Sequence, residues 1–401
     1  MMKSVEDKKR ILYCNQVFLD YRIPYYKELI RLFDGEFYVM YSPNRYHLMH
    51  RDDLVVRIKR EFGENAIAFK YDYLFDTATM SFTEVDGERG QKIPFMFGFL
   101  TAIRKVKPDV LITEAFFQWT PWGILYHLLF GIPLYIGYER TMHTERNNGW
   151  LKTWHRKLTD KFVKGYLVNG LETKKYLESI GVESEKIHCV GMSADSEGLK
   201  QSVADFRHSP LFLDLRQRFK KNNGLIFLFS GQIVERKGVK YLLEAWKTHC
   251  MSYPDDVLVL CGDGNQRKEL MAEYADVSGI RWEGRVPYER MHQYYAIADV
   301  FILPTLEDNW SLVVPEAMAC GLPVATTIYN GCHSELIEEG KNGFTFDSLD
   351  ADSTLKVLSL FHNRDLQAMG QTSVEIEQEF NTQNCTKRVR EALMLMQTIE
   401  S

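Results

Sequence analysis

Two acidic residues eight positions apart, Asp308 and Glu316, lie in the stretch of the sequence that most suggests chemistry. The stretch begins with an apolar run that ends at Leu303, which is typical of a buried strand, and continues as a polar loop. We expect Ser311 to cap a short helix that ends near Gly321. A loop that leads into a helix presents free backbone N–H groups and a positive dipole end, and this favours binding of a phosphate.

The spacing of the two carboxylates favours a ligand with hydroxyl groups at both ends and phosphates between them. At a rise of about 1.5 Å per helical residue, Asp308 and Glu316 can stand several ångströms apart along one ligand. A nucleotide sugar has this arrangement. In the structural alternative, Asp308 is only a cap and Glu316 only a surface residue, since short acidic motifs specify little by themselves.

The residues around the two acids resemble the donor site of family-four retaining glycosyltransferases, the "glycosyl transferases group 1" type, which have the GT-B fold. That family has a Glu, seven further residues, a second Glu and then Ala-Met-Ala-Cys-Gly-x-Pro-Val. Here Glu316 opens EAMACGLPV, whereas the first acid is Asp308, with Glu307 beside it. The resemblance implies that Glu316 holds the ribose hydroxyls. It also implies that Asp308 or Glu307 binds hydroxyls of the transferred sugar.

A second stretch, Gly231-Gln-Ile-Val-Glu-Arg-Lys-Gly238, follows the apolar run 225–230. Its glycines let the backbone approach a ligand, and Arg236 and Lys237 supply positive charge for a diphosphate. It resembles the family's Gly-loop-Lys-Gly motif, which follows the first strand of the C-terminal domain. The family often has Arg where Gln232 stands, so we expect Arg236 to replace that charge.

The resemblance implies electrostatic stabilisation of the leaving diphosphate by two cations and by the amides of residues 309–312. We expect no metal in this scheme, since two cations and a helix end replace it, and no cofactor, since the nucleotide sugar is a substrate. Val286 is expected to contact the base through its backbone. The catalytic candidates are Asp308, Glu316, His143, Arg236 and Lys237. The donor-binding candidates are Gly231, Arg236, Lys237, Val286, Glu307, Asp308, Asn309, Trp310, Ser311, Leu312 and Glu316.

Candidate acceptor-binding residues lie in loops that follow predicted strands, where doubly wound sheets bind ligands. They are Arg22, Trp119 and Glu139. His143 lies in the same charged loop as Glu139, and the family places a His or an acid in this region to reach the transferred sugar. The structural alternatives are a helix-flanking Arg22, a core Trp119 and an ordinary exposed His143.

Residues 150–166 predict a helix with one apolar and one basic face. Leu151, Trp154, Leu158 and Phe162 recur at helical spacing, and five Lys and Arg residues crowd the remainder. Such a helix can lie on an anionic membrane surface, with about 1 kcal/mol for each basic residue. The alternative is an ordinary domain helix with a solvated basic face.

The order of predicted strands and helices favours an α/β fold with two Rossmann-like domains that face a cleft. We expect an N-terminal acceptor-binding domain over 1–195, a linker over 196–223 and a nucleotide-sugar-binding domain over 224–373. A C-terminal helix over 374–401 is expected to cross back to the first domain.

The composition is that of a globular protein long enough for two domains, and its net charge of −5 does not suggest binding to nucleic acid. The seven cysteines are odd in number and lack a CxxC motif, which favours a reducing cytosol over a disulfide framework or a zinc site. The first 22 residues lack the apolar core of a signal peptide. The apolar stretch 119–138 is interrupted by Gly131 and Pro133, so we do not expect it to span a membrane.

These observations predict a retaining glycosyltransferase that uses a nucleotide-sugar donor and a sugar or lipid-linked acceptor. Surface polysaccharide or lipopolysaccharide synthesis is the setting that the family suggests, with the protein in the cytoplasm, alone or at the inner face of the cell membrane. One alternative is a nucleotide-sugar epimerase of the same fold. Another is a non-catalytic nucleotide-sugar-binding scaffold subunit, which only the Asp at position 308 favours.

Overall fold

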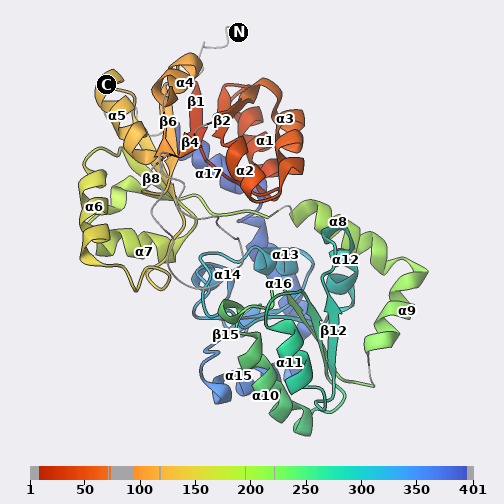
Figure 1. The fold of residues 1–401 in the computed structure, drawn as a ribbon. Helices are drawn as coiled ribbons and strands as arrows, with labels where there is room; N and C mark the ends of the chain where they lie inside the picture. The colour runs from red at the N-terminus through yellow and green to blue at the C-terminus, as the bar shows by residue number, and fades with distance from the viewer. Residues whose placement is uncertain are drawn as a thin grey trace, which may run out of the picture.

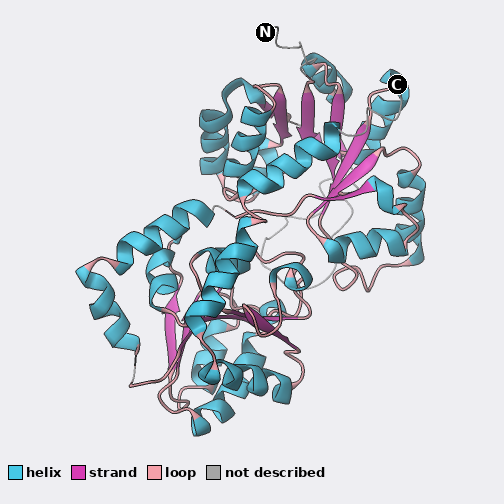
Figure 2. Cartoon of the chain, turned by 180° about the vertical axis from the view of Figure 1, so that it is seen from behind, coloured by secondary structure: helices cyan, strands magenta, loops and turns pink. Residues whose placement is uncertain are grey.

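The structure is a computed structural model that describes residues 9–70, 72–73, 94–96, 98–116, 119–194, 196–220 and 222–394. These residues form two large parallel sheets, each flanked by helices (Figures 1 and 2). The strands are buried along most of their length, because helices cover both faces of a parallel sheet. The predicted pair of Rossmann-like domains is therefore confirmed.

The first sheet has seven strands in the order β3-β2-β1-β6-β7-β8-β9. Its strands are β1 (Ile11–Cys14), β2 (Phe37–Tyr41), β3 (Ala66–Ala68), β6 (Val110–Glu114), β7 (Leu134–Tyr138), β8 (Gly165–Val168) and β9 (Ile187–Cys189). Its helices are α1 (Arg22–Leu32), α2 (Pro43–Leu48), α3 (Asp52–Phe62), α4 (Phe99–Val106), α5 (Thr120–Phe130), α6 (Trp150–Asp160) and α7 (Leu171–Ser179). A short antiparallel pair joins β4 (Asp72–Tyr73) to β5 (Pro94–Phe95).

The second sheet has six strands in the order β12-β11-β10-β13-β14-β15. Its strands are β10 (Ile226–Ser230), β11 (Val257–Cys261), β12 (Ile280–Gly284), β13 (Val300–Leu303), β14 (Val324–Thr327) and β15 (Gly343–Phe346). The helices before and around it are α8 (Ser196–Arg207), α9 (Pro210–Phe219), α10 (Val239–Ser252), α11 (Arg267–Glu273), α12 (Tyr288–Ile297), α13 (Val313–Ala319), α14 (His333–Leu336) and α15 (Ala351–Leu360). The last two described helices are α16 (Leu366–Gln378) and α17 (Thr382–Met394).

In each sheet the strand order reverses beside the first strand of that sheet. β1 lies between β2 and β6, and β10 lies between β11 and β13. Open α/β sheets bind ligands outside the carboxyl ends of their strands at such a reversal. The loops that follow β1 and β10 are therefore placed where ligands are expected.

Two predicted helices have the wrong bounds. The helix predicted over 150–166 ends at Asp160, because residues 165–168 form the buried strand β8. The single helix predicted from residue 374 is two helices, α16 and α17, separated by residues 379–381. Asn381 accepts a hydrogen bond from the Asn384 N–H at 2.8 Å, so its side chain helps to start α17 in a new direction. The segment 196–223, predicted as a linker, contains α8 and α9, which pack against α12.

The last helix, α17, packs against α1 of the first sheet, as predicted for the crossing helix (Figure 1). Cys385, Val389 and Leu393 of α17 are buried in the same apolar cluster as Ile23 and Leu29 of α1. Helix α17 is thus part of the core of the first domain.

The Leu393→Ala substitution tests this packing. It removes buried methyl groups from the first core, and we expect it to lower the unfolding free energy of the first domain by about 2–5 kcal/mol. The measurement is urea unfolding followed by two probes, because two domains need not unfold together. Lys387→Ala, at an exposed position of the same helix, should be nearly neutral. Equal effects of the two substitutions would contradict the burial of α17.

Candidate functional site

The acidic loop that follows β13 holds its first acid in a fixed position. The Oδ2 atom of Asp308 accepts hydrogen bonds from Lys237 Nζ at 2.5 Å and from Ser311 Oγ at 2.5 Å. Its Oδ1 atom accepts from the Trp310 N–H at 3.2 Å. The two motifs that the sequence singled out therefore meet at the ion pair of Lys237 and Asp308.

The charge state of Asp308 follows from these contacts. Burial raises the pKa of a carboxyl group, but the Lys237 ammonium and the Ser311 hydroxyl outweigh burial here, so the pKa of Asp308 lies below its ordinary value. Lys237 is only 9% exposed, and its charge is therefore poorly screened by solvent. Asp308 is ionised and oriented at neutral pH.

The predicted Ser311 cap is wrong. Leu312 is the N-cap residue of α13 and has no side-chain cap, since the Ser311 hydroxyl donates to Asp308 instead. The Ser311 N–H donates to Asn330 Oδ1 at 3.2 Å, and the Trp310 N–H donates to Asp308. Two of the four amides predicted to face a diphosphate thus bind within the protein, whereas Leu312 faces a cavity.

The second acid, Glu316, lines a cavity of about 1140 Å³ between the two domains. Glu316 is 8% exposed, and its Oε2 accepts a hydrogen bond from the Tyr295 hydroxyl at 3.0 Å. Gly231 and Val286 line the same cavity, so the cavity collects predicted residues from three separate segments. From the first domain it is lined by Asp20, Tyr21, Pro24 and Arg57.

The cations of the second motif lie beside this cavity and do not line it. Arg236 is exposed, and its Nη2 donates to Gln232 Oε1 at 3.2 Å. Gln232 itself lines the cavity. Arg236 was expected to replace the Arg that the family often has at position 232. Its side chain therefore contacts Gln232, the residue at that position. Trp310 is buried and packs against Phe380, with ring centroids 5.6 Å apart.

The charged loop that follows β7 (residues 139–149) binds the acidic loop from the other domain. His143 Nε2 donates to the Leu306 carbonyl at 2.8 Å, and its ring lies 4.8 Å from that of Tyr329. Arg146 pairs with Glu307 at 2.7 Å. His143 thus contacts the acidic loop two residues from Asp308, and its contact with the transferred sugar stays a prediction.

Two residues in these inter-domain contacts were missed by the sequence reasoning. Thr144 Oγ1 donates to Asn309 Oδ1 at 2.8 Å, and Asn169 Nδ2 donates to the Asn309 carbonyl at 3.2 Å. Thr144 lies in the charged loop, and Asn169 directly follows β8. Their position after strands of the first sheet was the available signal, but uncharged side chains in a loop do not indicate a partner.

The predicted acceptor residues Arg22 and Glu139 form an ion pair in the first domain. Close to them, Glu114 Oε2 accepts a hydrogen bond from the Tyr13 hydroxyl at 2.5 Å. Burial, together with the nearby charge of Glu139, raises the pKa of Glu114 to about 8. Burial thus favours the protonated form of Glu114.

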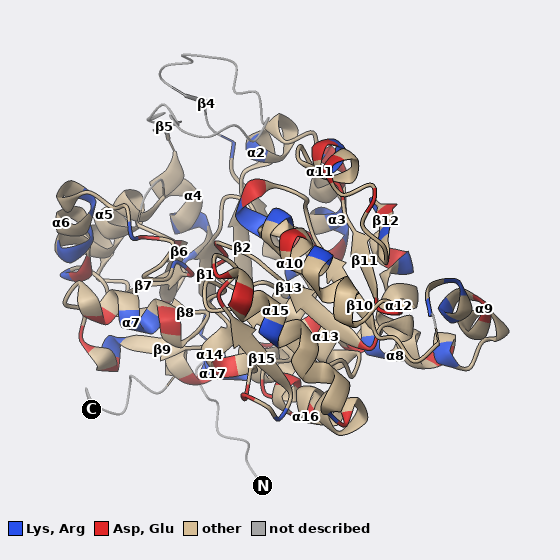
Figure 3. Cartoon of the chain, turned by 90° about the horizontal axis from the view of Figure 1, so that it is seen from below, with Lys and Arg blue, Asp and Glu red and all other residues tan. Residues whose placement is uncertain are grey.

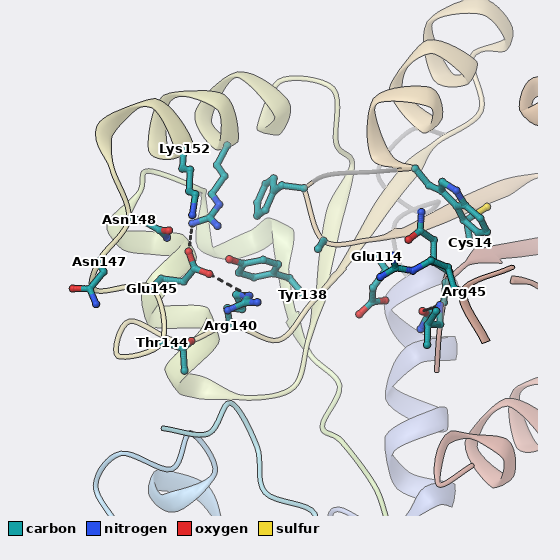
Figure 4. A pocket seen from close by; sticks show the side chains of 17 residues that line it. Cys14, Arg45, Glu114, Tyr138, Arg140, Thr144, Glu145, Asn147, Asn148 and Lys152 are labelled. Carbon is teal, nitrogen blue, oxygen red and sulfur yellow. Dashed lines mark hydrogen bonds and ion pairs between the residues drawn. The ribbon is translucent and has the colours of Figure 1, made fainter. Parts of the chain in front are cut away.

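A second cavity, of about 600 Å³, lies at the carboxyl ends of β1, β6 and β7 (Figure 4). Trp119, the third predicted acceptor residue, is 1% exposed and lines this cavity while packing on Phe99, with ring centroids 5.1 Å apart. Thr144 also lines it, so the cavity borders the contact between the charged loop and Asn309.

One group of potential metal ligands lies outside both cavities among the described residues. His249, Asp256 and His362 bring their ligand atoms within 4.8 Å of one another. Asp256 Oδ2 accepts from His249 Nε2 and His362 Nε2, each at 2.8 Å. Hydrogen bonds therefore account for the cluster.

Part of the chain matches a known protein family. Residues 213–372 match the model of the family "Glycosyl transferases group 1". Sulfoquinovosyl transferase SQD2 of Arabidopsis thaliana is 28% identical over 45% of this chain and 36% of that protein. An Escherichia coli UDP-Gal:alpha-D-GlcNAc-diphosphoundecaprenol alpha-1,3-galactosyltransferase is 24% identical over 52% of this chain and 53% of that protein. The matches thus cover from about a third to about half of these relatives.

Solved structures confirm the predicted fold. Anabaena Alr3699/HepE in complex with UDP has a TM-score of 0.72 and 15% identity, over 96% of this chain and 99% of that chain. The lipopolysaccharide outer core galactosyltransferase WaaB has a TM-score of 0.69 and 13% identity, over 97% and 99% of the two chains. They confirm the predicted GT-B fold, and the family match over residues 213–372 supports the predicted family for that part of the chain.

The Lys237→Met substitution tests the ion pair that joins the two motifs. It leaves the ionised Asp308 buried without its cation, and we expect a loss of about 3–5 kcal/mol in unfolding free energy, most of which Lys237→Met/Asp308→Asn recovers. Lys341→Met breaks the exposed pair with Glu338 and should cost less than about 1 kcal/mol. Equal losses in Lys237→Met and Lys341→Met would contradict a buried pair.

The same pair has a predictable pH dependence. The folded pKa of Asp308 lies below its unfolded value, so its contribution is present above the unfolded pKa and is lost as pH falls through the folded pKa. The difference in unfolding free energy between the wild type and Asp308→Asn should therefore shrink below about pH 4. A difference in unfolding free energy that grows as the pH falls would contradict a folded pKa of Asp308 below its unfolded value.

Proposed function

We propose that this chain, whose residues 213–372 form a glycosyl transferases group 1 domain within a GT-B fold, is a retaining hexosyltransferase. It moves a sugar from a nucleotide-sugar donor in the inter-domain cavity to an acceptor held by the first domain. The observation that carries this proposal is the convergence of Glu316, Gly231 and Val286 on one cavity, beside the Lys237–Asp308 pair.

In this proposal each acid has its own task. Glu316 faces the donor cavity and holds the ribose hydroxyls. Asp308 binds hydroxyls of the transferred sugar. A carboxylate offers about four lone pairs, and three protein donors leave Oδ1 able to accept one more hydrogen bond. Glu307 is the less suitable acid, since it is more exposed and already pairs with Arg146 across the domains.

Charge on the leaving diphosphate is stabilised by fixed positive groups. Leu312 lines the cavity, and Arg236 donates to Gln232, which also lines it. Lys237 donates a hydrogen bond to Asp308, which holds the ammonium group in place. Preorganised groups of this kind stabilise charge that develops in the transition state, so the proposed reaction proceeds without a metal ion. His143, bound to the acidic loop, positions that loop next to the transferred sugar.

The second cavity favours transfer over epimerisation. An epimerase needs a donor site but no second substrate, whereas this chain has a separate cavity of about 600 Å³ in the first domain. Thr144 lines that cavity and contacts Asn309, the neighbour of Asp308. An acceptor bound there would lie close to the proposed sugar-binding acid, with Trp119, Arg22 and Glu139 in or near the walls.

The proposed setting is surface polysaccharide or lipopolysaccharide synthesis at the cytoplasmic face of the cell membrane. The names of the Escherichia coli relative and of WaaB support it. Helix α6 exposes Trp150, Leu151 and Trp154 at 75%, 61% and 59%, and the ribbon of α6 is blue at its Lys and Arg positions in Figure 3. Apolar and basic residues on one exposed helix suit an anionic membrane surface. Among the described residues, no helix is long and apolar enough to cross a bilayer.

Donor binding is tested by thermal stabilisation with UDP, GDP and ADP sugars. A ligand at 100 times its Kd should add about 2.7 kcal/mol to the stability of the domain that binds it. We expect a shift with one donor in the wild type and in Glu338→Gln, an exposed position of the same domain, and its loss in Glu316→Gln. Retention of the shift in Glu316→Gln would contradict the assigned donor site.

Membrane binding is tested by sedimentation with vesicles of phosphatidylglycerol. Trp150→Ser/Trp154→Ser removes two aromatic side chains from α6, and we expect at least tenfold weaker binding. The matched control is Leu211→Ser/Leu213→Ser, which changes two leucines of α9 that are 63% and 61% exposed. If both double variants bind as the wild type does, α6 is only a solvated domain helix.

A further inference from the structure

The second cavity carries an excess of positive charge that the proposed transfer reaction does not explain. Its charged lining residues are Arg45, Arg140, Lys152, Arg156, Glu114 and Glu145. A cavity that accepts only neutral sugar hydroxyls would need polar groups of both kinds, without this imbalance.

One acid of the cavity, Glu145, is already paired with cations of the protein. Glu145 is buried and pairs with Arg156 at 2.5 Å and with Arg140 at 3.3 Å (Figure 4). Arg156 is also held by the Tyr176 hydroxyl and lies over the ring of Phe116, 5.4 Å from its centroid. Arg156 is thus a fixed structural cation, and a single carboxylate serves two guanidinium groups.

The other acid adds little negative charge at neutral pH. Glu114 is buried, accepts from the Tyr13 hydroxyl, and has a pKa raised to about 8 by its burial and by Glu139. The cavity therefore presents more cationic than anionic groups to whatever enters it.

Two cations and a buried hydroxyl are available for a ligand. The Arg140 side chain is 48% exposed and shares Glu145 with Arg156, and exposed Lys152 has no acid partner among the residues that the structure describes. The Tyr138 hydroxyl is buried in the wall and makes no hydrogen bond, although Tyr138 is only 2% exposed. A buried hydroxyl without a partner costs free energy unless a ligand satisfies it.

We propose that the second cavity binds an acceptor through a phosphate group, with Arg140 and Lys152 as its cationic contacts and the Tyr138 hydroxyl as a further donor. A phosphate offers several strong acceptor oxygens, which suits a wall made of cations and donors. This inference rests on the proposed function, in that it assigns the acceptor of the same transfer. The acceptor is then a sugar phosphate, either free or linked to a lipid.

The test is isothermal titration of the full chain, kept saturated with UDP so that the donor cavity is filled, with glucose 1-phosphate and with glucose. We expect glucose 1-phosphate to bind at least tenfold more tightly than glucose. Lys152→Gln and Arg140→Gln should each weaken glucose 1-phosphate about tenfold and leave glucose unchanged, since a hydrogen bond to a charged group contributes about that factor. Lys105→Gln, at an exposed site of α4 that does not line the cavity, should change neither.

Tyr138→Phe is a second variant that removes one oxygen and no packing volume. It should weaken glucose 1-phosphate binding and leave the melting temperature unchanged or higher, whereas a purely structural hydroxyl would lower the melting temperature. Dodecyl phosphate distinguishes the two sources of the group. Tighter binding than glucose 1-phosphate assigns a lipid-linked acceptor, and weaker binding assigns a soluble sugar phosphate.

Equal binding of glucose and glucose 1-phosphate would overturn the inference, as would a preference for glucuronate, which carries a carboxylate. The results distinguish failure of the phosphate-acceptor proposal from failure of the proposed transferase function. Stabilisation by UDP without phosphate discrimination leaves the transferase intact and removes the phosphate acceptor. Lys152-dependent binding of glucose 1-phosphate in a protein that no nucleotide stabilises leaves the phosphate site intact and removes the donor assignment.

Discussion

The ion pair of Lys237 and Asp308 is the interaction on which the proposed site depends. The Asp308 carboxylate in this partly buried loop is kept ionised chiefly by the Lys237 ammonium group, 2.5 Å away. Gly238 makes that approach possible. It has a φ of +66°, and a Cβ there would lie 2.0 Å from the Pro304 carbonyl oxygen. The Leu306 N–H then donates to the Arg236 carbonyl at 2.8 Å, which joins the two loops along their backbones.

This joined pair of loops is also the surface to which the first domain binds. His143, Thr144, Arg146 and Asn169 all contact residues 306–309. Each is a hydrogen bond or an ion pair at the domain contact, where individual interactions are worth little and can be exchanged. Helix α17 is different, because its apolar residues lie in the first core. The domains are therefore held together by a permanent crossing helix and by polar contacts at the site, an arrangement that allows the cleft to open and close around ligands.

Much of the second domain could be predicted from sequence because its signals are local. Strand, loop and helix follow one another around Asp308 and Glu316, and the motif itself fixes the register of the acids. The Ser311 cap could not be excluded locally, since the competing acceptor, Asp308, is oriented by Lys237 from a segment 71 residues away. The break between α16 and α17 was missed because a continuous helix satisfies the apolar pattern, although Asn381, which accepts from the Asn384 N–H, is a local signal of a helix start. The second cavity is assembled from four separate segments, and its charge balance depends on pairings that no spacing reveals.

The most direct test of the central claim is to follow a nucleotide sugar by NMR while the protein acts on it. With the donor selected by thermal stabilisation and a glycosyl phosphate as acceptor, the account predicts free nucleoside diphosphate and a product whose anomeric configuration matches that of the donor. Asp308→Ala should abolish this signal without preventing nucleotide binding. Donor that binds but stays intact with every acceptor would contradict transferase activity and favour a scaffold, and a product of inverted configuration would contradict the assigned mechanism.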